Sequence, residues 1–169
     1  YNKGGLLSIY MDETFFNVKP NYKLRKVATQ LVLRQFPAGC NMAFRRNALF
    51  KIGNFDERIK FGFDDLVPVE ELGKAGFRIV LDPEVYVYHQ HRTRFWEILF
   101  QHFSYGRGGA KLIKVKRRSK LAQWFITYLI SSTFSLIIIL SLFYVGLMLN
   151  QHVLIDIALG IFIFFYAVL

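Results

Sequence analysis

Two neighbouring carboxylates are the side chains of this sequence best suited to acid–base chemistry. Asp64 and Asp65 stand at the predicted start of a helix, in the stretch "FGFDDLVPVEELGKAGF". Two close carboxylates raise each other's pKa, and a raised pKa suits a general base. The same pattern is also typical of helix capping alone, in which a carboxylate accepts hydrogen bonds from backbone N–H groups. Both interpretations stay open from the pattern.

A second cluster follows a predicted strand, where two histidines and two arginines fall within six positions. His89 and His91 are two residues apart, so on a strand their side chains share a face and can ligate a metal. Arg92 and Arg94 add positive charge, as expected at the rim of a site that faces an anion. Surface or core roles without chemistry explain the same residues equally well.

The elements that must position these side chains alternate between helix and strand. The stretch "MAF" alternates like a short strand, and "RRNALFKIG" predicts a short helix with Gly53 just past its end. A second helix starts at Asp64 or Asp65, tolerates Pro68 in its first turn and ends at Gly76. "RIVL" predicts a buried strand, "DPE" a turn and "VYVYH" another strand. This alternation predicts an α/β layered domain.

The first 35 residues carry weaker signals. "LSIYM" is compatible with a strand, and "NYKLRKVATQLVLRQF" predicts an amphipathic helix or a lipid-facing segment. Cys40 is the only cysteine, which rules out an internal disulfide and a multi-cysteine zinc site. Its expected role is that of a small buried residue.

Charged and apolar residues are segregated along the chain. The net charge is +10 and hydrophobic residues make up 53% of the sequence, yet every Lys and Arg lies before Leu121. The charge-free stretch from Trp124 to Leu149 is long enough to cross a bilayer core, which takes about 20 apolar residues. "VLIDIALGIFIFFYAVL" predicts a second span that stops in mid-run. We therefore expect two transmembrane helices over residues 121–169, the second truncated.

Residues 93–120 predict an amphipathic interfacial segment and a basic juxtamembrane run. Five apolar side chains at helical spacing form a wide face: Phe95, Trp96, Leu99, Phe100 and Phe103. The "GRGG" at 106–109 predicts a break or bend in this helix. Six of the ten residues in "KLIKVKRRSK" are basic, which places this end in the cytoplasm and attracts anionic lipid. Because the juxtamembrane position explains this charge, we expect no nucleic-acid partner.

Three stretches in this order resemble the membrane-bound family 2 glycosyltransferases. They are "GCNMAFRRNALFKIGNFDERI", "DD…ELGKAGFRIVLDPEVYVYHQHR" and "QHFSYGRGGA". The family's middle motif usually reads Glu-Asp followed some ten residues later by Lys-Ala-Gly, and this sequence keeps the spacing with Asp64 in place of the glutamate. The resemblance implies that residues 1–92 are the C-terminal portion of a GT-A (nucleotide-diphospho-sugar transferase) domain, which transfers a sugar with inversion.

The resemblance also implies roles for the acidic pair and for the glycine-containing turn. Asp65 matches the catalytic base, and Asp64 matches its acidic neighbour. Gly39, Cys40 and Asn41 match the loop near the sugar and the acceptor. The substrates implied are a nucleotide-sugar donor and a lipid-linked or glycan acceptor.

A further set of residues matches the polar groups around the diphosphate and the acceptor. His89 or His91 corresponds to a histidine that often helps bind the metal or the diphosphate, and a divalent cation, magnesium or manganese, is the implied cofactor. Arg92 adds positive charge beside them. Gln101 and Arg107 fall where related enzymes place an interfacial helix beside the acceptor.

One departure from the family is large. Its nucleotide-binding half, with a metal-binding Asp-x-Asp, precedes these motifs, and "YMDET" at 10–14 is not a convincing substitute. We therefore expect a piece of a longer protein that binds nucleotide poorly by itself. The predicted whole is a multi-pass glycosyltransferase of the plasma membrane with a cytoplasmic catalytic part. The alternative is a non-catalytic membrane anchor or assembly subunit with a docking domain.

Overall fold

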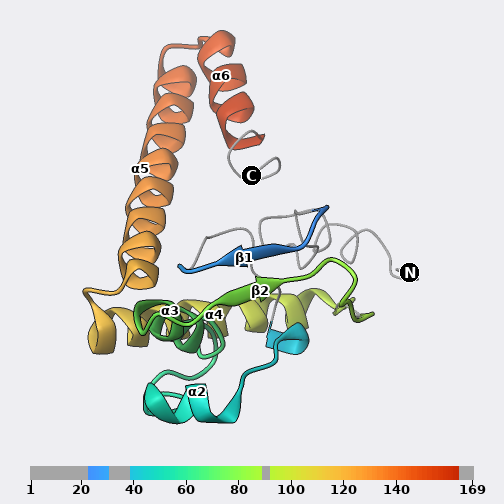
Figure 1. Cartoon of the computed structure of the whole chain (residues 1–169). Coiled ribbons are helices and arrows are strands. Elements are labelled where there is room, and N and C mark those ends of the chain that lie inside the picture. The colour runs from blue at the N-terminus through green and yellow to red at the C-terminus, as the bar shows by residue number, and fades with distance from the viewer. Residues whose placement is uncertain (1–22, 31–38, 89–91, 164–169) are drawn as a thin grey trace. The chain divides into compact units, whose positions relative to one another are not determined.

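The computed structural model describes residues 23–30, 39–88 and 92–163 of the 169-residue chain (Figure 1). The chain divides into two compact units, residues 1–123 and residues 124–169. The strand predicted at "LSIYM" lies outside the described residues.

Among the described residues, the first unit contains one sheet, made of β1 (Lys26–Ala28) and β2 (Ile79–Leu81). The two strands run antiparallel with Val27 opposite Val80, and they lie side by side in Figure 1. The strand predicted at "RIVL" is confirmed, although only Leu81 in it is buried. Of the two alternatives for the stretch around β1, the amphipathic helix is wrong for these three residues, because β-branched side chains that face each other across a ladder favour strand pairing.

Two short helices confirm the predictions for the middle of the chain. They are α2 (Arg46–Lys51) and α3 (Leu66–Lys74). Gly53 and Gly76 follow them with φ of 83° each, a left-handed conformation that glycine adopts without a steric penalty. Pro68 lies in the first turn of α3, where its missing N–H costs no helical hydrogen bond.

Two predicted strands are wrong. Residues 42–44 and the described residues 85–88 do not form strands, and Tyr88 is 84% exposed. The turn between β2 and the second of these segments is confirmed, because the Val85 N–H donates to the Asp82 carbonyl oxygen at 3.3 Å. The carbonyl oxygen of Val85 accepts from the Asn41 side chain at 3.1 Å, a contact that replaces a ladder hydrogen bond.

Helix α4 runs without interruption from Phe95 to Lys116, so of the break or bend predicted at "GRGG" the break is wrong. A Cβ atom at Gly108 would lie 2.8 Å from the carbonyl oxygen of Gly62 and 3.0 Å from that of Phe61. This glycine therefore allows a loop to approach the helix closely instead of ending the helix.

The core of the first unit lies where α3, the second half of α4 and the first turn of α5 (Lys120–Met148) meet. Its buried members are Ile59, Val67, Leu112, Leu121 and Ala122. Each fully buried aliphatic side chain of this kind contributes about 1.5–3 kcal/mol to folding. The same core thus holds the helix that follows Asp65 and the start of the apolar helix.

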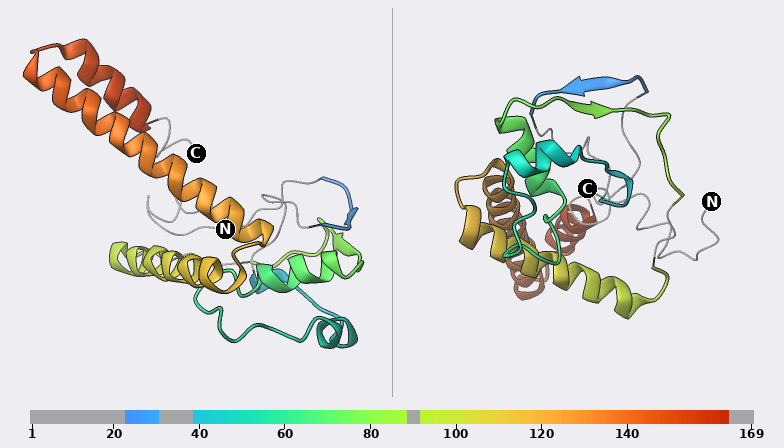
Figure 2. Two further views of the ribbon diagram at one scale, coloured as in Figure 1. Left: turned by 90° about the vertical axis from the view of Figure 1, so that its left-hand side faces the viewer. Right: turned by 60° about the horizontal axis from the view of Figure 1, so that its bottom comes forward.

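The second unit consists of the rest of α5 and of α6 (His152–Ile163), which form a hairpin (Figures 1 and 2). Among the described residues, α5 is the one helix that is long and apolar enough to cross a membrane, with a mean hydropathy of 2.1 in its most apolar window. Helix α6 is shorter, and residues 164–169 lie outside the description. The second span therefore stays a prediction.

Candidate functional site

Asp64 and Asp65 stand at the start of α3, but neither side chain caps the helix. Asp65 occupies the N-cap position with a helical backbone, and its carboxylate makes no capping hydrogen bond. The carboxylate of Asp64 accepts a hydrogen bond from the Gly62 N–H at 3.1 Å, on the side away from the helix. Among the interactions described, neither acid therefore forms the usual N-cap hydrogen bond to the second or third N–H group of α3.

The environment of Asp65 favours its protonated form. Burial raises the pKa of the Asp65 carboxyl above its usual value, and the negative charge of Asp64 raises it further. The backbone N–H groups of Leu66 and Gly39 oppose this rise without cancelling it. A carboxylate whose pKa is raised accepts a proton more readily, which is the property that a general base needs.

The turn η1 (Gly39–Asn41) lies against the carboxylate of Asp65. A Cβ atom at Gly39 would lie 2.7 Å from Oδ2 of Asp65 and 3.1 Å from its Cβ. Glycine is the residue that permits so close an approach. The structure therefore brings together two segments that the sequence assigned to the same site.

Of the other two residues of η1, Cys40 is exposed and Asn41 makes a hydrogen bond to another segment. Cys40 is exposed, so its predicted burial is wrong. The reason is that its turn runs along the surface beside Asp65 and adds no residue to the buried core. The amide nitrogen of Asn41 donates to the Val85 carbonyl oxygen and anchors the turn, so this nitrogen is already occupied by the protein.

The loop before the acidic pair has an unusual backbone. Phe61, Gly62 and Phe63 have φ of 72°, 136° and 66°, so three consecutive residues are left-handed. A non-glycine residue in this region costs of the order of 1–3 kcal/mol and persists only where neighbouring structure holds it. Helix α4 supplies that support, because Tyr105 Cδ1 lies 3.1 Å from where a Gly62 Cβ would be. Sequence reasoning missed this loop, although a glycine between two aromatic residues is its signal.

Helix α4 also brings two cations over the same loop. The guanidinium of Arg107 lies 5.1 Å, and the ammonium of Lys111 5.4 Å, from the centre of the Phe61 ring. In the described part of the chain, no ion pair with a carboxylate involves either cation. Sequence reasoning selected Arg107 but missed Lys111, which lies one helical turn further on.

The remaining candidates on this side make local contacts. Gln101 donates to the hydroxyl of Tyr105 at 2.6 Å. Arg92 donates from Nη1 to the carbonyl oxygen of Glu97 at 3.2 Å, near the start of α4. The structure therefore ties Gln101 to the helix face that supports Gly62, but it gives Arg92 no contact with Asp65 among the interactions described.

The implied divalent cation has no complete set of ligands among the described residues. His89 and His91 lie outside them, and within residues 23–30, 39–88 and 92–163 no three histidine, cysteine or acidic side chains gather around a common point. Asp64 and Asp65 alone do not make a cation site.

A basic cavity of about 480 Å³ lies beside α2. Its lining comprises Arg45, Arg46, Asn47, Ala48, Lys51 and Phe77. Two of its cations lie over aromatic rings, Arg46 over Phe50 and Lys51 over Phe77. None of the residues predicted for the site lines this cavity.

Comparison of the chain with protein-family models, curated proteins and solved structures gives no match. The glycosyltransferase family and the GT-A fold therefore stay predictions that rest on the motifs.

Proposed function

We propose that this chain is the C-terminal part of a membrane-associated inverting glycosyltransferase, which moves a sugar from a nucleotide-sugar to a lipid-linked or polysaccharide acceptor. The observation that carries the proposal is the contact between Gly39 and the carboxylate of Asp65. These residues belong to separate motifs of the resemblance, the acceptor loop and the catalytic base. Their contact is what a shared site requires.

The proposed chemistry assigns the proton transfer to Asp65. The acceptor hydroxyl attacks the anomeric carbon of the donor sugar from the face opposite the leaving group. Its proton passes to the carboxylate of Asp65, while the bond between the anomeric carbon and the diphosphate oxygen breaks and its electron pair leaves with the diphosphate. The raised pKa of Asp65 supports this role, because a sugar hydroxyl is a poor nucleophile until its proton is removed.

The departing diphosphate needs positive charge nearby. Arg107 and Lys111 supply two cations above Phe61, in the loop that leads directly to the acidic pair. Fixed cations stabilise charge that develops on a leaving group. We assign the diphosphate to this side of the site.

Membrane attachment is proposed from two helices. Helix α5 has the length and composition of a span, and α4 exposes an aromatic face in which Trp96, Phe100 and Phe103 are 66%, 66% and 65% exposed. Aromatic and basic residues on one helix suit the interface of an anionic membrane. The basic run before α5 supports a cytoplasmic position for the proposed catalytic part, because positive residues next to a span favour that side.

A non-catalytic membrane anchor with a docking domain is the second candidate function. The exposed aromatic face of α4 favours it, because a face of this kind also suits a protein partner. This candidate does not explain why Gly39 contacts the carboxylate of Asp65.

Asp65→Asn in the full-length protein, assayed in membranes against a panel of nucleotide-sugars, separates the two candidates. Loss of a general base lowers kcat by about 100-fold or more. Asp56→Asn is the matched control, because Asp56 is an acid paired with Arg58, and its variant keeps turnover. Near-normal turnover of Asp65→Asn would refute the base assignment, and no turnover of the unmodified protein with any donor would favour the anchor.

A further inference from the structure

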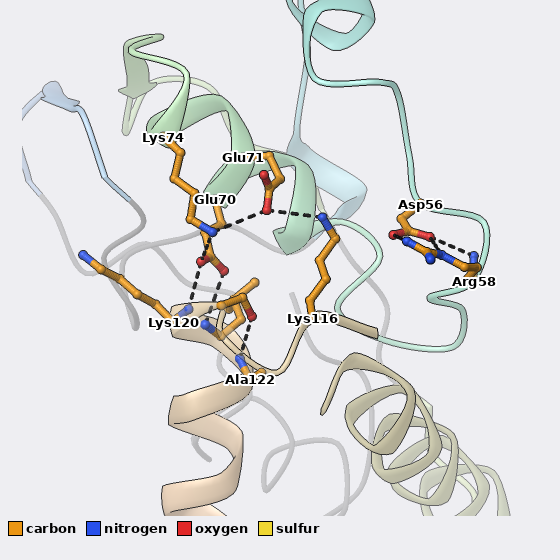
Figure 3. A network of polar contacts seen from close by, with 10 residues as sticks. Asp56, Arg58, Glu70, Glu71, Lys74, Lys116, Lys120 and Ala122 are labelled. Atoms are coloured by element: carbon orange, nitrogen blue, oxygen red, sulfur yellow. Dashed lines mark hydrogen bonds and ion pairs between the residues drawn. The ribbon is translucent and has the colours of Figure 1, made fainter. Parts of the chain in front are cut away.

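One buried carboxylate, that of Glu70, joins α3 to the first turn of α5 (Figure 3). The residue is only 4% exposed. Its Oε1 accepts a hydrogen bond from the Lys120 N–H at 2.8 Å, and its Oε2 accepts one from the Leu121 N–H at 3.3 Å. The ammonium of Lys74 lies 2.7 Å from Oε1. A carboxylate stays buried at tolerable cost only when donors surround it in this way.

These contacts complete the hydrogen bonding at the start of α5. The first four N–H groups of a helix have no partner within the helix. Here Ser119 N–H donates to the Lys116 carbonyl oxygen at 2.8 Å, and Ala122 N–H donates to Oγ of Ser119 at 3.0 Å. Glu70 takes the two N–H groups between them, so the first turn is satisfied only while α3 is in place.

The neighbouring Glu71 makes a different kind of contact. Its Oε1 lies 3.3 Å from the ammonium of Lys116 and 3.4 Å from that of Lys74. Its side chain is 30% exposed, against 4% for Glu70, and among the described residues no backbone N–H donates to it. Partly exposed pairs of this type contribute little. Glu71 is therefore a matched control with the same charge one residue away.

We infer that Glu70 is a positioning residue, which fixes the orientation of α3 relative to the first turn of α5 and thereby holds Asp65 against Gly39; the inference rests on the proposed function of Asp65. Helix α3 has nine residues, and an isolated helix of fewer than about 12 residues is unstable in water. Its orientation therefore depends on tertiary contacts. Glu70 supplies the directional ones, while Val67 and Leu72 supply apolar burial.

Hydrogen exchange tests the link without any assay of activity. In the unmodified chain in detergent micelles, the Lys120 and Leu121 amides exchange slowly, although amides at these helix positions ordinarily lack an internal partner. Glu70→Gln removes the charge and speeds their exchange by about 10-fold or more, and Glu71→Gln changes it by less than about 2-fold. Fast, unprotected exchange of both amides in the unmodified chain would show that Glu70 does not hold the start of α5. This outcome can be observed without any variant.

Kinetics of the full-length protein test the positioning. Displacement of a base by about 1 Å costs about 100-fold, so Glu70→Gln is expected to lower kcat by about 10- to 100-fold and to leave KM within about 2-fold. Glu71→Gln is expected to leave kcat and KM unchanged. An unchanged kcat in Glu70→Gln overturns the positioning role.

Two further outcomes keep the inference separate from the proposed function. If Glu70→Gln does not fold, Glu70→Asp is tested instead, because it keeps the negative charge on a shorter side chain. A smaller loss of kcat in the same direction is then expected. An unchanged kcat in that variant overturns the positioning role. If the unmodified protein transfers no sugar, the proposed function fails and positioning fails with it, while exchange at Lys120 and Leu121 still decides whether Glu70 holds the helix.

Discussion

Gly108 on α4 packs directly against the carbonyl oxygen of Gly62, in the loop that leads to Asp64. A Cβ atom at Gly108 would come within 2.8 Å of that oxygen. Helix α4 therefore supports the left-handed backbone before the acidic pair by direct backbone contact. The glycine is part of the site although its side chain is a hydrogen atom.

Gly108→Ala is expected to destabilise the first unit. The added methyl group meets two carbonyl oxygens of a constrained loop, and such overpacking costs about 1–3 kcal/mol. Gly106→Ala is the control in the same helix, because nothing lies within 4 Å of its Cβ position. That control gains up to about 1 kcal/mol of helix propensity. Denaturant unfolding measures both, and equal effects of the two changes would contradict the close approach.

The proposed role of Asp65 as the base predicts that the rate of sugar transfer falls in acid at a pH above the ordinary aspartate pKa of about 3.9. Burial raises the pKa of Asp65, so the carboxylate becomes protonated and loses its function as a base while the pH is still above that value. Asp64→Asn removes the charge that raises this pKa further, so the acid limb moves to lower pH. Profiles of kcat against pH for both proteins check this, and identical limbs would exclude coupling between the two acids.

The raised pKa also predicts how Asp65→Asn affects folding. A carboxyl whose folded-state pKa is raised stabilises the fold only at low pH, and that stability is lost as the pH rises through the folded-state value. Charged Asp65 therefore costs stability at neutral pH. Asp65→Asn is expected to unfold at a Tm at least as high as that of the unmodified chain at pH 7, whereas a lower Tm would show that the charge is structurally required.

The ion pair between Asp56 and Arg58 predicts a pH dependence of folding stability opposite to that of Asp65. A hydrogen bond from the Arg58 side chain, with that residue's charge, lowers the pKa of Asp56 to about 2. The stabilisation is present above the ordinary pKa and is lost as the pH falls through about 2. Arg58→Ala is expected to lower Tm slightly at pH 7, and the difference is expected to shrink as the pH approaches 2 and to vanish below it. A difference in Tm that persists there would assign the effect to packing.

In the second unit, the hairpin of α5 and α6 depends on a small residue. A Cβ atom at Gly146 would lie 2.8 Å from Cγ1 and 3.2 Å from the backbone nitrogen of Ile155. Gly146→Val is expected to separate the helices and to cost about 1–3 kcal/mol. Gly160→Val is the control, since nothing lies within 4 Å of its Cβ position. Thermal unfolding in detergent compares the two, and equal losses would contradict the packing.

Local signals predicted the elements that depend on local contacts. Gly53 and Gly76 marked the ends of α2 and α3, because a left-handed residue after a helix is a property of the chain at that point. The strands predicted at 42–44 and 85–89 failed over their described residues because a strand needs a partner elsewhere in the chain. The break predicted at Gly106–Gly109 failed because the role of Gly108 depends on a distant loop.

The candidate site was predicted in part. The motif pattern selected Gly39 and Asp65, and the structure places them in contact. It did not select Glu70, whose partners at Lys120 and Leu121 lie on a separate helix. The sequence does not indicate which of two adjacent glutamates on a helix has the buried side chain. Lys111 was missed for the same reason, since only the fold brings it over Phe61.

The exposed thiol of Cys40 allows a fluorescent label to be attached beside the candidate site. It is the only cysteine of the chain, and it stands next to the glycine that touches Asp65. A maleimide fluorophore therefore labels one chosen point of this chain without any mutation. Quenching of its emission on addition of a sugar acceptor would register occupancy beside Asp65 without a coupled assay.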